Sequence, residues 1–96
     1  MNERRILMNK VDQLRLEGAR IKKERVFDEI QNLGLDYQEL AERLQALTGH
    51  PVITTSINLW ATGRRNIPLS YLEAFSKLLG VSEAYLLGRT DDPKML

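Results

Sequence analysis

Residues 36–63 read DYQELAERLQALTGHPVITTSINLWATG and carry the clearest helix signals in the chain. Asp36 and Glu39 have the spacing of a helix capping box, in which two side chains satisfy free backbone N–H groups at the start of a helix. An apolar face follows at helical spacing, formed by Leu40, Ala41, Leu44 and Leu47. A second helix, at about residues 54–62, places Ile57, Trp60 and Ala61 on one side. The stretch therefore predicts two short helices joined by a turn at residues 48–52.

Glycines mark where the helices are expected to end. Five of the six glycines each follow an apolar periodic run, namely Gly34, Gly49, Gly63, Gly80 and Gly88. Because glycine readily adopts the left-handed conformation that ends many helices, five helices are expected. Ser70, followed by Glu73, and Ser82 are expected to cap the last two. No segment alternates between apolar and polar residues, so the sequence predicts an all-α chain.

Residues 1–22 are expected to form an amphipathic helical extension. One heptad-like seam runs along it, formed by Leu7, Val11, Leu14 and Ile21, with Gly18 at its fourth place. This seam is a candidate contact with a second copy of the chain or with a partner protein. A second apolar face, out of phase with the first, is assigned to the core and consists of Val26, Phe27, Ile30 and Leu33. The domain is expected to cover residues 23–88, and residues 89–96 to form a flexible tail.

The composition argues against several classes of protein. The 96 residues suffice for one small domain, and 43% hydrophobic with 28% charged residues is a globular rather than a disordered balance. The chain has no cysteine and one histidine, His50, so neither a nucleophile–base arrangement nor a metal site is expected. The longest apolar run, residues 84–87, is too short to span a membrane. We therefore expect a cytoplasmic protein with no membrane association, enzymatic activity, cofactor or metal.

Acidic residues are distributed unevenly along the chain. Although 13 of the 96 residues are acidic and the net charge is +1, none lies between Glu42 and Glu73. The same interval contains Arg43, His50, Arg64 and Arg65. Such a bias suits a surface that contacts a polyanion, although an ordinary neutral core segment is the alternative.

The outer side of helix 54–62 carries groups that suit contact with DNA bases. It has short polar side chains, one leucine and no charge, and comprises Thr54, Thr55, Ser56, Asn58, Leu59 and Thr62. An asparagine can pair with adenine, hydroxyls with several base edges, and an apolar group with a thymine methyl. The alternative is a helix buried against a protein partner.

Groups suited to phosphate flank this helix. Arg64, Arg65 and Asn66 follow it in a turn, where they can set the register on a DNA backbone, unless they are merely solvated loop charges. Tyr37, Gln38 and free backbone N–H groups stand at the start of the preceding helix, another frequent phosphate contact.

The order and spacing of these motifs resemble the phage-repressor (XRE-type, lambda-repressor-like) helix-turn-helix family. The resemblance covers about residues 26–93 and rests on Leu40-Ala41, Ile57, Trp60, Gly63-Arg64-Arg65, Ile67-Pro68, Leu79-Gly80-Val81-Ser82 and the run from Tyr85 to Pro93. It implies a compact five-helix bundle whose third helix enters the major groove. It also implies base reading by Thr54, Thr55, Ser56, Asn58 and Leu59, and phosphate binding by Tyr37, Gln38, Thr62, Arg64, Arg65 and Asn66.

Two features depart from the family pattern. Ile57 follows Ala41 by sixteen positions, more than is usual, so a longer second helix or an enlarged turn is expected. The minimal family domain also lacks an extension like residues 1–22.

The resemblance and the residues together lead to a functional hypothesis. They predict a sequence-specific regulator of transcription that binds double-stranded DNA as a homodimer, a repressor of the phage or mobile-element type. The alternative is a protein-interaction module, an antirepressor or antitoxin-like adaptor, whose amino-terminal helix binds a regulatory protein partner.

Overall fold

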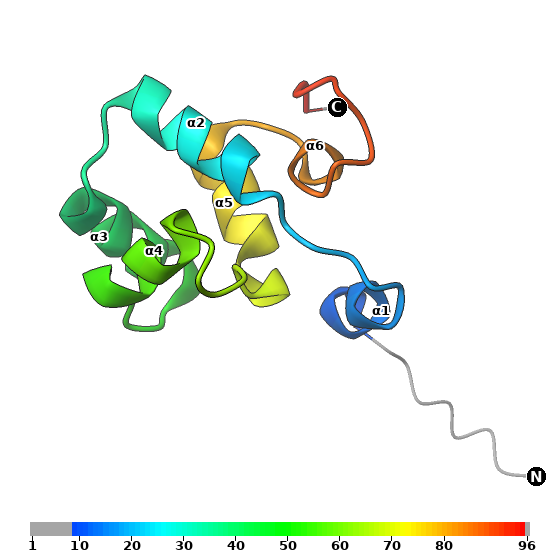
Figure 1. Ribbon diagram of the computed structural model, residues 1–96, viewed down its shortest axis with the longest axis horizontal. Helices are drawn as coiled ribbons and strands as arrows, with labels where there is room; N and C mark the ends of the chain where they lie inside the picture. Colours follow the sequence, from blue (N-terminus) through cyan, green and yellow to red (C-terminus); the bar gives the residue numbers. More distant parts are fainter. Residues whose placement is uncertain (1–8, 96) are drawn as a thin grey trace, which may run out of the picture.

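The computed structural model describes residues 9–95, and within them the chain is helical, with no strand. The elements are α1 (Lys10–Leu16), α2 (Lys23–Leu33), α3 (Tyr37–Thr48), α4 (Thr54–Ala61), the short 3-10 helix η1 (Leu69–Tyr71), α5 (Leu72–Leu79) and α6 (Glu83–Leu86). In Figure 1, α2 to α6 gather into one bundle, and α1 lies at its edge at the end of an extended connection. The prediction of an all-α chain is confirmed for these residues.

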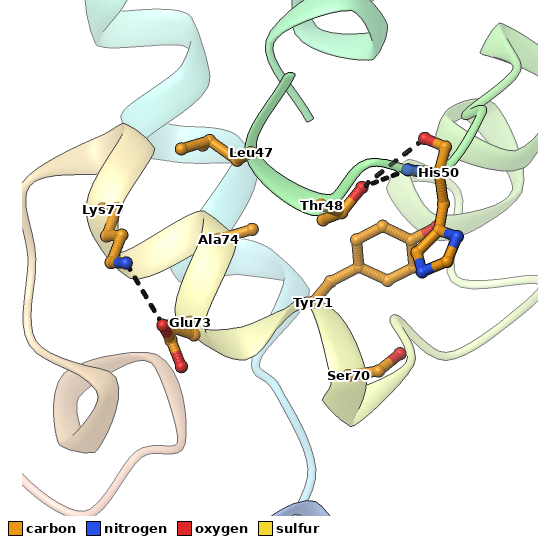
Figure 2. A pocket seen from close by; sticks show the side chains of 8 residues that line it. All are labelled: Leu47, Thr48, His50, Ser70, Tyr71, Glu73, Ala74 and Lys77. Carbon is orange, nitrogen blue, oxygen red and sulfur yellow. Dashed lines mark hydrogen bonds and ion pairs between the residues drawn. The ribbon is translucent and has the colours of Figure 1, made fainter. Parts of the chain in front are cut away.

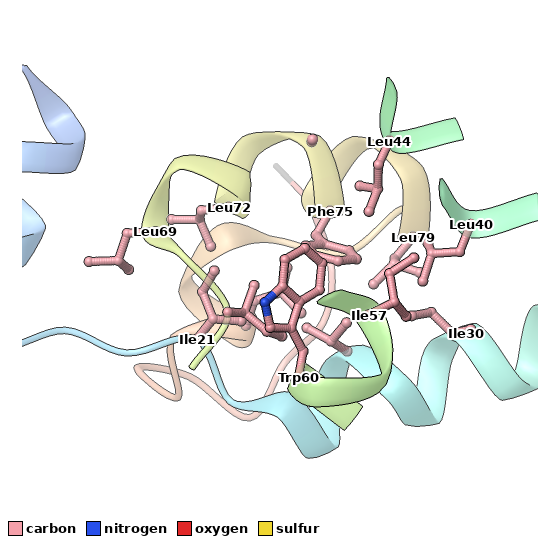
Figure 3. Packing of buried hydrophobic residues seen from close by; sticks show 14 of the residues in the cluster. Ile21, Ile30, Leu40, Leu44, Ile57, Trp60, Leu69, Leu72, Phe75 and Leu79 are labelled. Carbon is pink, nitrogen blue, oxygen red and sulfur yellow. The ribbon is translucent and has the colours of Figure 1, made fainter. Parts of the chain in front are cut away.

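The central helix of the bundle is α5, which packs against α2, α3 and α6. Phe75 of α5 is fully buried, and the centroid of the Trp60 ring of α4 lies 6.2 Å from that of Phe75 (Figure 3). The Trp60 centroid also lies 5.1 Å from that of Tyr71. Burial of one large apolar side chain stabilises a fold by about 1.5–3 kcal/mol. Trp60 therefore fixes one side of α4 against the core.

Two of the three predicted caps are present. In the capping box of α3, the Glu39 N–H donates to Asp36 Oδ1 at 2.8 Å and the Asp36 N–H donates to Glu39 Oε1 at 3.2 Å. Ser82 accepts a hydrogen bond from the Tyr85 N–H at the start of α6. The prediction for Ser70 is wrong, because this residue lies inside η1 and α5 begins without a side-chain cap.

The connection between α3 and α4 accounts for the long separation of Ala41 and Ile57. The α3 helix has twelve residues, and residues 49–53 then lead to α4. The Thr48 hydroxyl donates to the Leu44 carbonyl at 2.8 Å and accepts from the His50 N–H at 3.2 Å. These bonds fix the turn that precedes α4.

Within residues 9–22, the predicted extension is interrupted after α1 and packs more firmly than the sequence suggested. Gly18 has φ +73°, a left-handed conformation, and follows α1 where a continuous helix was expected. Leu14 and Ile21 are only 6% and 8% exposed and belong to the protein's own core, while Val11 packs partly buried against it. Leu7 lies outside the described residues. Two members of the predicted contact seam, Leu14 and Ile21, therefore pack inside the protein's own core.

Ion pairs also hold α1 to the body. Lys10 Nζ lies 2.8 Å from a Glu83 carboxylate oxygen, and Arg89 Nη2 lies 2.6 Å from Glu17 Oε1. The hydrogen bond to Glu83 raises the pKa of the Lys10 ammonium, against a smaller lowering by desolvation. The connection from α1 to α2 is thus anchored at its α1 end.

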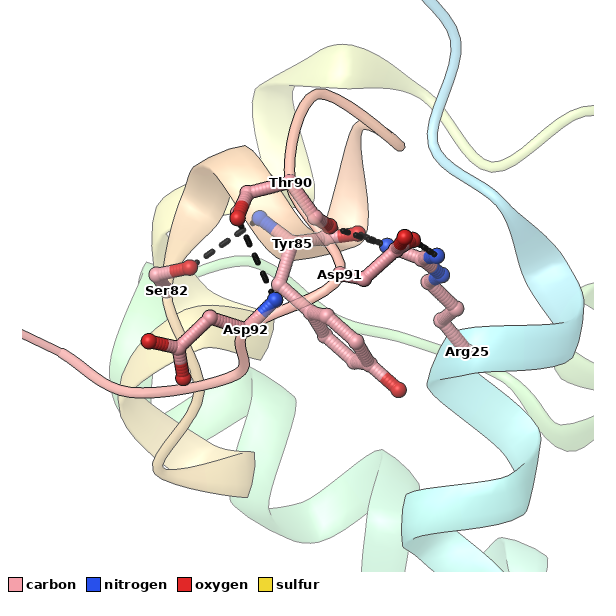
Figure 4. A network of polar contacts seen from close by, with 6 residues as sticks. All are labelled: Arg25, Ser82, Tyr85, Thr90, Asp91 and Asp92. Carbon is pink, nitrogen blue, oxygen red and sulfur yellow. Dashed lines mark hydrogen bonds and ion pairs between the residues drawn. The ribbon is translucent and has the colours of Figure 1, made fainter.

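The carboxyl-terminal segment differs from the predicted flexible tail. Arg25 Nη1 donates to the carbonyl oxygens of Tyr85 and Thr90 at 2.8 and 2.6 Å, and Nη2 donates to Asp91 Oδ1 at 2.7 Å (Figure 4). The same guanidinium lies 4.3 Å from the centroid of the Tyr85 ring. The Ser82 N–H donates to the Pro93 carbonyl. Residues 89–93 are therefore tied to α2 and α6.

Candidate nucleic-acid interface

The outer face of α4 is presented by a helix whose opposite face is fully packed. Ile57 and Trp60 are 0% and 3% exposed. Thr54, Thr55 and Asn58 are exposed on the other side, in a helix without a charged residue. Since residues three and four positions apart are neighbours on a helix surface, these three side chains form one patch. We call this patch the α4 polar face.

Two of the predicted base-reading residues are less accessible than the others. Ser56 and Leu59 are half-buried, although the sequence placed Leu59 on the exposed side. By contrast, Ile53, which was not predicted as a site residue, is 62% exposed directly before Thr54. An exposed aliphatic group at that position adds a possible contact for a thymine methyl.

Thr62 has a structural role at the end of α4. Its hydroxyl donates to the Asn58 carbonyl at 2.9 Å and approaches the Leu59 carbonyl at 3.3 Å. The hydroxyl proton is thus engaged with the helix, which leaves only an acceptor for outside groups. Because a phosphate requires a donor, Thr62 is poorly suited to the phosphate contact predicted for it.

The loop after α4 fixes two positive charges at the end of that helix. The N–H groups of Arg64 and Arg65 both donate to the Leu59 carbonyl, at 3.0 and 3.1 Å. Gly63 has φ +75°, which allows the chain to turn sharply there. The side chains of Arg64, Arg65 and Asn66 are exposed, as a contact with phosphate requires.

The start of α3 is a weaker phosphate site than the sequence suggested. The Glu39 N–H is occupied by Asp36, so it is not free, and both carboxylates place negative charge at this end of the helix. Gln38 is exposed, but its amide donates to Glu42 at 3.2 Å. Tyr37 is half-buried and packs edge-on against Phe27. The cationic groups that could bind phosphate therefore concentrate at the other end of the motif, after α4.

Sequence reasoning missed three cations that lie beside this loop. Arg20 and Lys22, from the connection between α1 and α2, and Lys23, the first residue of α2, line a cleft together with Arg65 and Asn66. The only signal in the sequence was the cluster of basic residues near position 22. Nothing in that signal showed that the cluster lies next to residues forty positions further along the chain.

A second hollow, of about 320 Å³, lies between the end of α3 and the start of α5 (Figure 2). The interactions drawn there are the bonds of Thr48 with the His50 backbone and the ion pair of Lys77 with Glu73 at 3.2 Å. Both stabilise local structure. Among residues 9–95, no three side chains of the metal-binding types come together to hold an ion.

Comparison of the chain with protein-family models, with curated proteins and with solved structures finds no match. In the part of the chain that the structure describes, no helix has both the length and the apolar character needed to cross a membrane. The features of the described residues that bear on function are the α4 polar face and the exposed arginines of the loop that follows it.

Proposed function

We propose that this protein is a sequence-specific regulator of transcription of the phage-repressor (lambda-repressor-like) helix-turn-helix type. In this proposal it acts as a repressor, binds double-stranded DNA as a homodimer and places α4 in the major groove. The observation that carries the proposal is the α4 polar face, an uncharged hydrogen-bonding surface on a helix anchored by Ile57 and Trp60.

The dimensions of α4 suit a groove. An α-helix with its side chains is about 10–12 Å in diameter, and the major groove is about 12 Å wide. In helix-turn-helix proteins the first residues of the recognition helix contact the bases. Thr54 and Thr55 stand in this first turn, and Asn58 follows on the same side one turn later. Asn58 can accept from and donate to one adenine at the same time.

The loop after α4 supplies contacts that do not depend on sequence. The guanidinium groups of Arg64 and Arg65 can donate to phosphate oxygens in pairs, and their backbone bonds to Leu59 hold the loop at the end of α4. Phosphate contacts of this kind set the register of the helix on the duplex.

The homodimer follows from the small size of this surface. One short helix contacts few base pairs, and two copies on a pseudo-palindromic site double the number that is read. Leu14 and Ile21 are buried in the core and so are not offered to a second copy or to the regulatory protein partner of the alternative hypothesis, an amino-terminal helix that binds such a partner.

The experiment is a selection of binding sites from random duplexes, followed by affinity measurements on the selected and on a scrambled duplex. We expect Asn58→Ala or Thr55→Ala to lose about 1–3 kcal/mol of discrimination at particular base pairs and to leave the scrambled duplex unaffected. We expect Arg64→Ala or Arg65→Ala to weaken binding of both duplexes equally. Each should also make the slope of log affinity against log salt less steep by about 0.9.

The matched control for Asn58→Ala is Asn32→Ala, which removes the same side chain from the exposed surface of α2. It should change neither affinity nor preference. Equal effects of the α4 and arginine variants on every duplex, or a selected site without two related halves, would contradict the proposal.

A further inference from the structure

A cationic cleft lies beside the proposed reading helix. It has a volume of about 500 Å³ and is bounded by residues 18–24, which comprise the connection from α1 and the start of α2, and by residues 63–67, which follow α4. Its charged lining residues are Arg20, Lys22, Lys23, Glu24 and Arg65, an excess of three positive charges. We call it the linker cleft.

The backbone of the linker cleft is held from both sides. Ile21 and Ile67 are buried in the core and lie in the cleft lining, one from each segment. The Lys22 N–H donates to the Leu86 carbonyl at 2.8 Å. Because Arg20 and Lys22 flank a buried residue, the positions from which their side chains extend are fixed.

Two glycines make room for the lysine side chains. A Cβ on Gly88 would collide with Cε of Lys22, and a Cβ on Gly63 would lie 3.0 Å from Cε of Lys23. The aliphatic parts of both lysines therefore lie against bare backbone, which restricts where the ammonium groups can go. The side chain of Lys23, at the start of α2, thereby lies against the loop that carries Arg65.

Three of the four cations of the linker cleft form no ion pair within residues 9–95. Ion pairs within residues 9–95 involve Lys10, Arg15, Lys23, Arg25, Lys77 and Arg89. None involves Arg20, Lys22 or Arg65. Only Lys23 approaches a carboxylate, that of Glu24 at 3.6 Å. An anion that enters the cleft can therefore bind Arg20, Lys22 and Arg65 without breaking an ion pair among the described residues.

Glu24 does not cancel this excess. A hydrogen bond from its own backbone N–H lowers the pKa of its carboxyl, against desolvation, and the charges of Lys23 and Lys22 lower it further. The carboxylate is therefore ionised at neutral pH, and its charge is already counted in the excess of three positive charges.

We infer that the linker cleft binds backbone phosphate of the same DNA duplex that α4 reads, through Arg20, Lys22 and Lys23 in addition to Arg65. This inference rests on the proposed function. Arg65 and Asn66 belong both to the cleft and to the loop at the end of α4, so a duplex with α4 in its major groove brings one strand to this loop. Ammonium and guanidinium groups are the donors that phosphate oxygens prefer.

The test compares two charge-matched double variants. Arg20→Gln/Lys22→Gln removes two cleft charges and keeps part of each aliphatic chain, while Lys77→Gln/Lys94→Gln removes two charges from α5 and the carboxyl-terminal segment. Affinity for the selected duplex is measured by fluorescence anisotropy between 50 and 200 mM salt. Loss of two phosphate contacts makes the slope of log affinity against log salt less steep by about 1.8. The affinity of the wild type should therefore fall about 12-fold more than that of the cleft variant over this range. The control should keep the wild-type slope.

The outcomes separate this inference from the proposed function. A wild type that binds duplex while the cleft variant keeps the wild-type slope overturns the inference alone. A wild type that binds no duplex overturns both.

Inorganic pyrophosphate provides a second experiment. If it raises the Tm of the wild type but not of the cleft variant, and the duplex slopes are equal, the cleft binds a free phosphate compound and the DNA assignment fails. If the double variant does not fold, Arg20→Gln alone, at an exposed position, should lower the slope by about 0.9.

Discussion

At the scale of the residue, Arg25 joins three parts of the chain. It stands near the start of α2 and bonds the carbonyl oxygens of Tyr85 and Thr90 as well as the Asp91 carboxylate. The sequence shows a basic residue in a charged cluster, but its partners lie at least sixty positions away. Because the sequence gives no sign of these long-range contacts, the segment after residue 88 was predicted to be flexible.

Arg25→Ala should lower the free energy of unfolding by about 1–3 kcal/mol, because two carbonyl oxygens lose a charged donor. Arg25→Lys should recover little of this, since one ammonium cannot reproduce the fork of the guanidinium. Urea denaturation measures both.

The control for Arg25→Ala is Arg43→Ala, at an exposed position of α3 that forms no ion pair within residues 9–95. We expect it to change stability by less than about 0.5 kcal/mol. Equal stabilities of the two alanine variants would show that the contacts of Arg25 do not hold the carboxyl-terminal segment.

Local signals in the sequence were reliable where the bonding partners are near neighbours. The capping box of Asp36 and Glu39 and the cap at Ser82 each span three residues, so the sequence contains both partners. Ser70 has the same spacing to Glu73, yet Leu69 and Leu72 are both buried. A 3-10 turn brings residues three positions apart onto one side, so burial of these two leucines overrides the cap.

At the scale of the element, α1 shows the limit of periodicity. The pattern identified its apolar residues correctly, but a pattern does not say which surface they meet. The stop at Gly18 lets the chain turn, so that Leu14 and Ile21 both reach the core of the same molecule. A dimer contact and an intramolecular contact look alike in sequence.

Two leucines of α1 provide a matched test of this packing. Leu14 is 6% exposed and Leu16 is 76% exposed. Leu14→Ala should lower the free energy of unfolding by about 2–3 kcal/mol, at the lower end for a buried leucine because α1 lies at the edge of the bundle. Leu16→Ala should change it by less than about 0.5 kcal/mol.

Denaturation of both α1 variants, together with sedimentation at several concentrations, gives the answer. If Leu14→Ala left the stability of the monomer unchanged and weakened self-association instead, α1 would be an intermolecular element, as the sequence suggested.

The α4 helix illustrates the opposite case. Its period alone placed Ile57 and Trp60 inward and Thr55 and Thr62 outward, and the structure has them so. The period placed Leu59 outward as well, but this residue is half-buried. How far a side chain is buried depends on which other parts of the chain fold against it, and the period of one helix does not show this.

At the scale of the whole molecule, the distribution of charge matters more than its sum. The net charge is only +1. Yet the cations that link α1, α6 and the carboxyl-terminal segment are paired with carboxylates, whereas those of the linker cleft and the α4 loop include Arg20, Lys22, Arg64 and Arg65, which form no ion pair within residues 9–95. A local excess of this kind attracts a polyanion even when the whole chain is nearly neutral.

The central claim, that this cationic region and the α4 polar face bind duplex DNA, is tested most directly by a salt titration of affinity for a random duplex, with a neutral polymer as competitor. Phosphate contacts from Arg20, Lys22, Lys23, Arg64 and Arg65 predict a slope of log affinity against log salt of about −4.5 for each bound copy, and no competition by the neutral polymer. A slope near zero, or displacement by the neutral polymer as effective as by duplex, would contradict the account.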